Sequence, residues 1–122
     1  MATYENQQVH TFVSAGDLSA DQFRFLTVNT DGKVQVAGAG DEVIGILLND
    51  PDGADQAAQV GTFGISRVEA AEAIDGGKPV TPNASGQAVL AGSGDDVAGV
   101  VIGGAAGAGE IVSIFLNPRG KV

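Results

Sequence analysis

The 122-residue sequence contains no cysteine and no tryptophan, and His10 is its single histidine. Without cysteine, the chain has no disulfide scaffold, no thiolate zinc site and no cysteine nucleophile. His10 stands in a polar segment with no serine or carboxylate arranged around it, so the sequence does not yield a catalytic triad. We therefore expect no enzymatic activity, no metal site and no cofactor.

Positive charge and long apolar segments are also scarce. Six lysine and arginine residues stand against fifteen aspartate and glutamate residues, which gives a formal net charge of −9. Such a surface repels phosphate backbones, so we expect no nucleic-acid partner. No apolar run approaches the ~20 residues of a membrane-spanning helix, and the N-terminus lacks the basic and apolar regions of a signal peptide. We expect no membrane partner and synthesis in the cytoplasm.

Aromatic residues are few as well: the chain has six of them, against nineteen glycines. Large aromatic side chains dominate burial in most cores, and glycine raises the entropy cost of ordering the backbone. A core built from Ala, Val, Ile and Leu is expected to gain part of its stability by association. This composition predicts a homo-oligomer.

What the sequence does contain is an internal repeat. The phrase AGAGDEVIGI at 37–46 returns as AGSGDDVAGV at 91–100, 54 residues later (91 minus 37). Without a gap, nine of the nineteen positions from Thr27 to Gly45 are identical to their counterparts. Farther on, an alignment that loses two residues pairs Val60 with Val112 and Phe63 with Phe115. Two copies are too few for a solenoid and favour a pseudo-symmetric β fold.

Each copy has the same order of expected elements. A strand leads through an Asn-to-Gly turn, NTDG or NASG, into a short strand, and the glycine phrase then precedes an apolar run, VIGILL or VAGVVI. The Asn and Gly positions suit tight turns, and a glycine inside an apolar strand indicates a bulge or a close backbone approach. Short helices are expected at two places, SAGDLSADQ with a capping-box pattern at Ser14 and Asp17, and VEAAEAIDGG.

These elements predict an all-β fold, a small antiparallel β barrel or sandwich with an internal pseudo-two-fold repeat, one or two very short helices and an extended N-terminal arm. The arm covers residues 1–13. A single β domain covers 14–122, with repeats at about 14–68 and 69–117 and a short C-terminal tail. Because the arm lies outside the repeat, we expect the domain to fold without it.

Three patterns resemble binding sites, and each is interpreted as scaffold or loop. In GAGDEVIG the third glycine is too late for a dinucleotide fingerprint, and two acids stand where the pyrophosphate would lie. The loop GGAAGAGE lacks the lysine and hydroxyl of a phosphate-binding loop. Asp50, Asp52 and Asp55 offer oxygens around Gly53, but their spacing does not match an EF-hand, so an exposed acidic turn is favoured.

The phrases GDEVIGI at 40–46 and GDDVAGV at 94–100, with GKPVT at 77–81 leading into the second copy, give the chain a recognisable order of features. Over roughly residues 14 to 117, this order resembles the capsid cement, or head decoration, proteins of tailed bacteriophages. The resemblance implies a structural virion protein that binds the outside of an assembled capsid and cements the shell. It further implies the major capsid protein as partner, a homotrimer, a place on the outer capsid surface and no catalytic residues.

For such a protein, the apolar residues of the arm are the expected docking residues, because an extended segment can add to the edge of a partner's sheet. They are Tyr4, Val9, Phe12 and Val13. Two other kinds of function stay open on the sequence. One is another structural module of a virion or tail, such as a tube or fibre domain, and the other is a small ligand-binding β domain.

Overall fold

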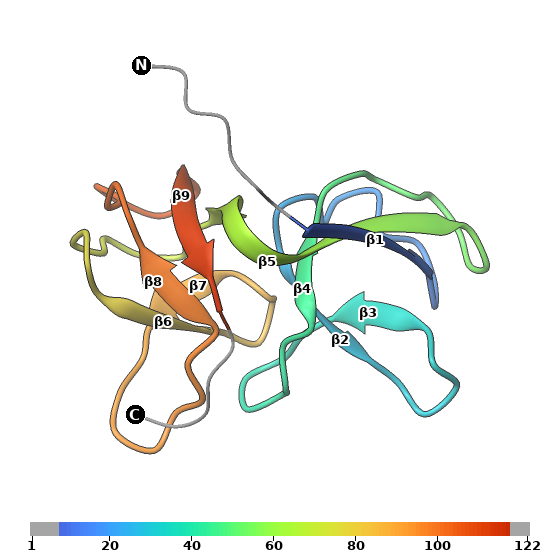
Figure 1. Cartoon of the computed structure of the whole chain (residues 1–122), viewed down its shortest axis with the longest axis horizontal. Helices are drawn as coiled ribbons and strands as arrows, with labels where there is room; N and C mark the ends of the chain where they lie inside the picture. Colours follow the sequence, from blue (N-terminus) through green and yellow to red (C-terminus); the bar gives the residue numbers. More distant parts are fainter. Residues whose placement is uncertain (1–7, 118–122) are drawn as a thin grey trace.

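The computed structural model describes residues 8–117, and in this part of the chain every regular element is a β-strand (Figure 1). The predicted all-β class is therefore confirmed. Within these residues no helix is long and apolar enough to cross a membrane. The nine strands are β1 (Gln8–Val13), β2 (Phe25–Val28), β3 (Val34–Val36), β4 (Gly45–Leu47), β5 (Ala57–Glu69), β6 (Pro79–Pro82), β7 (Ala88–Leu90), β8 (Gly99–Val101) and β9 (Ile111–Leu116).

The predicted short helices are wrong, because neighbouring strands use the backbone donors of both segments. Ser14 does not cap a helix. Its N–H donates to the carbonyl of Gln56, and its hydroxyl donates to the carbonyl of Gly53 over 2.7 Å. In the Ala/Glu-rich segment, Ala70 forms a bridge with Ala88, whose carbonyl accepts the N–H of the next residue, Ala71. Tertiary pairing has thus overridden the local helix signals.

The strands form two antiparallel sheets of five, and the long strand β5 belongs to both. The order is β1-β5-β4-β2-β3 in one sheet and β5-β9-β8-β6-β7 in the other. A parallel bridge brings the edges of each sheet together, Ser14 with Val34 in the first and Ala70 with Ala88 in the second. Figure 1 shows β5 passing from the neighbourhood of β1 to that of β9. The result is a pair of small barrel-like modules joined by one strand.

The strand register confirms the internal repeat. Leu26 pairs with Val36 in the first sheet, and Val80 pairs with Leu90 in the second, with both partners 54 residues later (80 minus 26, 90 minus 36). Backbone conformation repeats with the same spacing. Most residues with positive φ form pairs that are 54 apart (77 minus 23), namely Phe23 and Gly77, Gly32 and Gly86, Gly40 and Gly94, and Asp55 and Gly109.

Strand pairing also corrects the alignment of the closing strands. Ile46 pairs with Gly61 and Val100 pairs with Phe115, so the counterpart of Phe115 is Gly61 and not Phe63. No residues are lost at this point. The second copy loses its two residues earlier. The pair Phe12–Ala58 corresponds to the pair Val68–Val112, so β1 lies 56 residues (68 minus 12) before its counterpart in β5, and the spacing falls to 54 farther along the chain.

The repeat consequently starts at β1. β1 pairs with the first half of β5, and in the same way the second half of β5 pairs with β9. The first module therefore covers 8–63 and the second covers 64–117. Residues 1–7 of the expected arm lie outside the described residues. Residues 8–13 are a strand of the first sheet, so the expectation that the domain folds without residues 1–13 has to be revised.

Each module has a core of small and branched side chains. One buried cluster, in the first module, consists of Leu18, Leu26, Val34, Leu47, Ala58 and Val60, with Phe12, Val36 and Ile44 packed against it. The larger cluster contains the second module's counterparts, such as Val80, Val101 and Ile114. It also takes in Phe25, Ala37 and Ile46 from the first module, so the two modules share a packed interface.

This interface has direct backbone contacts. The Phe25 N–H donates to the Gly86 carbonyl and the Glu69 N–H donates to the Phe23 carbonyl, each over 2.8 Å. Arg24 completes the contact. Its guanidinium lies 3.6 Å from the Glu69 carboxylate and donates to the carbonyl of Ser85 over 3.4 Å. The modules therefore meet through the start of β2 on one side and the β6–β7 turn on the other.

Candidate interaction surfaces

The structure places three of the four predicted docking residues on β1, and Tyr4 lies outside the described residues. Val9 and Val13 pair with Gly61 and Ala57, and both valine side chains are 45% exposed. Phe12, whose side chain alternates to the opposite face, packs against the first module's core. The strand thus brings Val9 and Val13 onto one accessible face and keeps Phe12 inside.

Sequence reasoning missed a second apolar surface, the Phe63–Phe115 cluster, which consists of Phe63, Phe115, Ile65 and Val100. The two phenyl rings meet edge to face, with centroids 5.5 Å apart and an interplanar angle of 77°. Phe63 is 43% exposed and Phe115 is 36% exposed. Ile65 and Val100 flank Phe115 on β5 and β8 as its cross-strand partners. Alternation in IVSIFL was the available signal, because Ile111, Ser113 and Phe115 share the outward face.

The repeated glycine-acid phrase forms a pair of closed turns. The Asp41 carboxylate accepts the Gly38 N–H, and the Asp95 carboxylate accepts the Gly92 N–H, each over 2.8 Å. Directly before each aspartate stands a second glycine, Gly40 or Gly94. Its φ is positive, a backbone conformation that glycine readily adopts. The interpretation of the phrase as scaffold fits this geometry, with the first acid of each copy closing its own turn.

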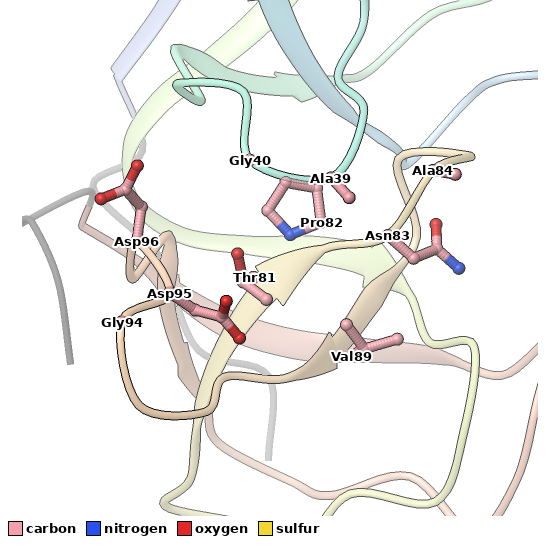
Figure 2. Close-up of a pocket in the computed structure, with 10 residues that line it drawn as sticks. All are labelled: Ala39, Gly40, Thr81, Pro82, Asn83, Ala84, Val89, Gly94, Asp95 and Asp96. Atoms are coloured by element: carbon pink, nitrogen blue, oxygen red, sulfur yellow. The ribbon is translucent and has the colours of Figure 1, made fainter.

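These two turns flank the hollow drawn in Figure 2. It has a volume of about 320 Å³, and its lining consists of Ala39, Gly40, Thr81, Pro82, Asn83, Ala84, Val89, Gly94, Asp95 and Asp96. Small side chains from both modules form most of its wall, and acids stand at one end (Figure 2). The Asn83 amide oxygen accepts the N–H groups of Ser85 and Gln87, so this side chain is used in holding its own turn.

The acidic turn after β4 is organised by contacts within the protein. Asp52 accepts a hydrogen bond from the Gln56 amide, and Asp55 forms a 2.6 Å ion pair with Lys33. The hydrogen bond and the charge of Asp55 hold the pKa of Lys33 above its usual value. His10 lies exposed on β1, opposite Val60. Among residues 8–117, no three His, Cys, Asp or Glu side chains gather in a metal-binding arrangement.

Together these features define a class, a small all-β protein of two tandem modules that presents apolar clusters on an acidic surface. The same fold occurs in a solved structure described as the head fiber gp8.5 N base in bacteriophage phi29. The TM-score is 0.73 at 19% identity, and the match covers 95% of this chain and 98% of that chain. No family model and no curated protein sequence matches the chain. At this identity the likeness establishes a shared fold.

Proposed function

We propose that this chain is a structural protein of a bacteriophage virion, which binds the outside of the assembled capsid and stabilises the shell. The observation that carries the proposal is the shared fold, which extends over 95% of this chain and 98% of the head fibre base. The resemblance of the glycine-acid phrases to capsid cement proteins points to the same part of a virion. Fold alone does not define function, so the proposal needs the surfaces as well.

The described surfaces suit a binding role on the outside of a shell. The Phe63–Phe115 cluster exposes apolar area of the kind that marks protein interfaces. A net charge of −9 keeps the chain away from packaged DNA and suits an outward position. On this proposal the partner is the major capsid protein. The chain itself acts as a homotrimer without enzymatic activity, cofactor, nucleic acid or membrane, and it is made in the host cytoplasm.

A trimer on a lattice of identical subunits binds at several points at once. Weak single contacts then add up to durable attachment, because the second and third contacts form at a high effective concentration. The apolar clusters do not need to be large for this purpose. Shell stabilisation follows when one trimer links neighbouring capsid subunits.

The test uses purified protein added to capsids that lack it. We expect saturable binding and a higher temperature of capsid rupture. The variants Phe63→Ser and Phe115→Ser should bind less, whereas Val28→Ser, which changes a side chain of similar exposure on β2, should bind like the wild type. Phe63→Ser and Phe115→Ser each also lose the edge-to-face ring contact, so binding is compared at a temperature at which thermal unfolding shows all three variants to be folded. Unchanged rupture temperature at full occupancy would rule out cementing.

A second function is favoured by one observation, since the solved structure of like fold is itself the base of a head fibre. On this alternative the chain attaches a projecting fibre to the head. Capsid binding would then be retained while the rupture temperature would stay unchanged. The same experiment therefore separates the two functions.

A further inference from the structure

The contact between the two modules can be compared, through the repeat, with the equivalent surfaces on the opposite module, and it is called the template below. In the template, the first module contributes Phe23, Arg24, Phe25, Ala37 and Ile46. Phe25, Ala37 and Ile46 are fully buried there. The second module contributes Glu69, Ser85 and Gly86 from the end of β5 and the β6–β7 turn.

Each of these surfaces has a counterpart on the other module, and its residues are exposed or half-buried within the described chain, except for the buried Ala91. The Lys78 face of the second module corresponds to the first module's contribution and consists of Gly77, Lys78, Pro79, Ala91 and Val100. The Asp31 face of the first module corresponds to the second module's contribution and consists of Val13, Asp31 and Gly32. Within one chain these two faces remain free, because the template uses only the opposite faces of each module.

Residues that are buried in the contact between the modules have counterparts that are exposed, as expected of a surface without its partner. Gly86 is buried, and a Cβ built on it would lie 2.6 Å from a methyl group of Val36. Its counterpart Gly32 is exposed, and a Cβ there would meet nothing within 4 Å. The counterpart of Val36 is Leu90, whose side chain is 50% exposed. Leu90 therefore stands where the template places a side chain against the turn glycine.

The charges on the two faces are complementary. Lys78 is the counterpart of Arg24, and Asp31 is the counterpart of Ser85, whose carbonyl accepts a hydrogen bond from Arg24. Docking by the template therefore brings the Lys78 ammonium of one copy to the backbone carbonyl of Asp31 in the next, where the Asp31 side chain adds a negative charge nearby. Both side chains are exposed, and Lys78 forms no ion pair with the described residues.

We infer that the Lys78 face of one copy binds the Asp31 face of a second copy, head to tail, as the first module binds the second. Two template interactions are lost: Pro79 replaces Phe25 and has no N–H to donate, and Val13 stands at the position of Glu69, so the ion pair with Arg24 has no counterpart. The contact is accordingly weaker than its template and reversible. Val13 and Leu90 supply apolar area that the contact removes from water.

A head-to-tail contact uses two different surfaces, so it closes into a ring or extends into a filament. Three copies that close would give a ring of six modules, which gives the homotrimer of the proposed function a concrete geometry. The inference refines that oligomer, yet it does not depend on capsid binding. It can be tested with the purified chain alone.

Sedimentation velocity over a wide range of concentrations tests the contact through charge reversal. The variants Lys78→Glu and Asp31→Lys should each weaken self-association roughly ten-fold, because each sets like charges against one another. The double variant, with both changes in one chain, should recover association, since every contact then pairs a negative charge at position 78 with a positive charge at position 31. A mixture of the two single variants should also associate better than either alone.

Matched controls reverse exposed charges elsewhere, with Asp50→Lys for the acid and Arg67→Glu for the base, and should associate like the wild type. Equal unfolding temperatures for all variants exclude a folding defect. A wild type that stays monomeric at every concentration would overturn the inference, and so would single variants that associate normally or a double variant no better than the singles. Because no capsid is present, failure of capsid binding would leave this result intact.

Discussion

Gly45 and Gly99 occupy equivalent positions in the two apolar runs, and replacing either with alanine should destabilise the fold. A Cβ on Gly99 would collide with the backbone oxygen of Phe115 and approach Ile114 to 3.1 Å. A Cβ on Gly45 would collide with the Gly61 oxygen and lie 2.6 Å from Val60. The obstructing oxygens belong to paired strands, so neither can move without disturbing the sheet.

Overpacking of this kind costs about 1–3 kcal/mol. Because backbone must shift, we expect the upper half, about 2–3 kcal/mol, for each substitution. At roughly 4 °C per kcal/mol for a domain of this size, the unfolding midpoint should fall by about 8–12 °C. The two variants should behave alike, since the same contact recurs in both modules.

Thermal unfolding followed by far-UV circular dichroism measures the effect. Gly16→Ala and Gly103→Ala serve as controls, because a Cβ at either position meets nothing within 4 Å and neither φ is positive. We expect these controls to unfold at the wild-type midpoint or slightly above it, because Gly→Ala at a compatible site raises the free energy of unfolding by up to ~1 kcal/mol. If Gly99→Ala unfolds at the same temperature as Gly103→Ala, the close packing of β8 on β9 is wrong.

Three further predictions concern the first module. Deleting residues 1–13, which removes β1, should lower the unfolding midpoint strongly and promote aggregation through the bared edge of β5. Ser14→Ala should cost about 1–3 kcal/mol in urea unfolding, because the part-buried Gly53 carbonyl loses its donor and the Gln56 N–H loses its acceptor. Asp55→Asn should lower the pKa of Lys33 toward its ordinary value, as an NMR titration of the Lys33 side chain would show. An unchanged Lys33 pKa would contradict the 2.6 Å ion pair.

The repeat could be read from the sequence because it preserves backbone chemistry. Turn glycines such as Gly40 and Gly94 are held by the positive φ that their turns require. The glycine in each apolar run was predicted to mark a bulge or a close approach, and Gly45 and Gly99 show the close approach. Positions fixed by sterics therefore gave reliable signals.

Other parts of the fold depend on contacts between distant segments. The start of the repeat was hidden because β1 and its counterpart, the second half of β5, share no obvious side chains, and only the hydrogen-bonded register relates them. The apparent match of Phe63 with Phe115 had a different cause. The two rings are neighbours in space and not equivalents in the repeat.

The candidate surfaces were only partly predictable for the same reason. Val9 and Val13 were found as apolar residues in a polar segment, and both are exposed. Phe12 was grouped with them because the sequence does not show which face of this strand packs against a core. Alternation in IVSIFL could have placed Phe115 on an outward face, but the contact of Phe115 with Phe63 depends on the pairing of β5 with β9, which the sequence does not reveal.

The proposed function places this protein on the outer surface of a phage capsid as a structural component. Electron cryomicroscopy of virions assembled with and without the protein tests this claim most directly. We predict difference density on the outer face of the shell into which the two-module fold fits, in contact with the major capsid protein. Difference density confined to the tail or the capsid interior, or identical shells in the two samples, would contradict it.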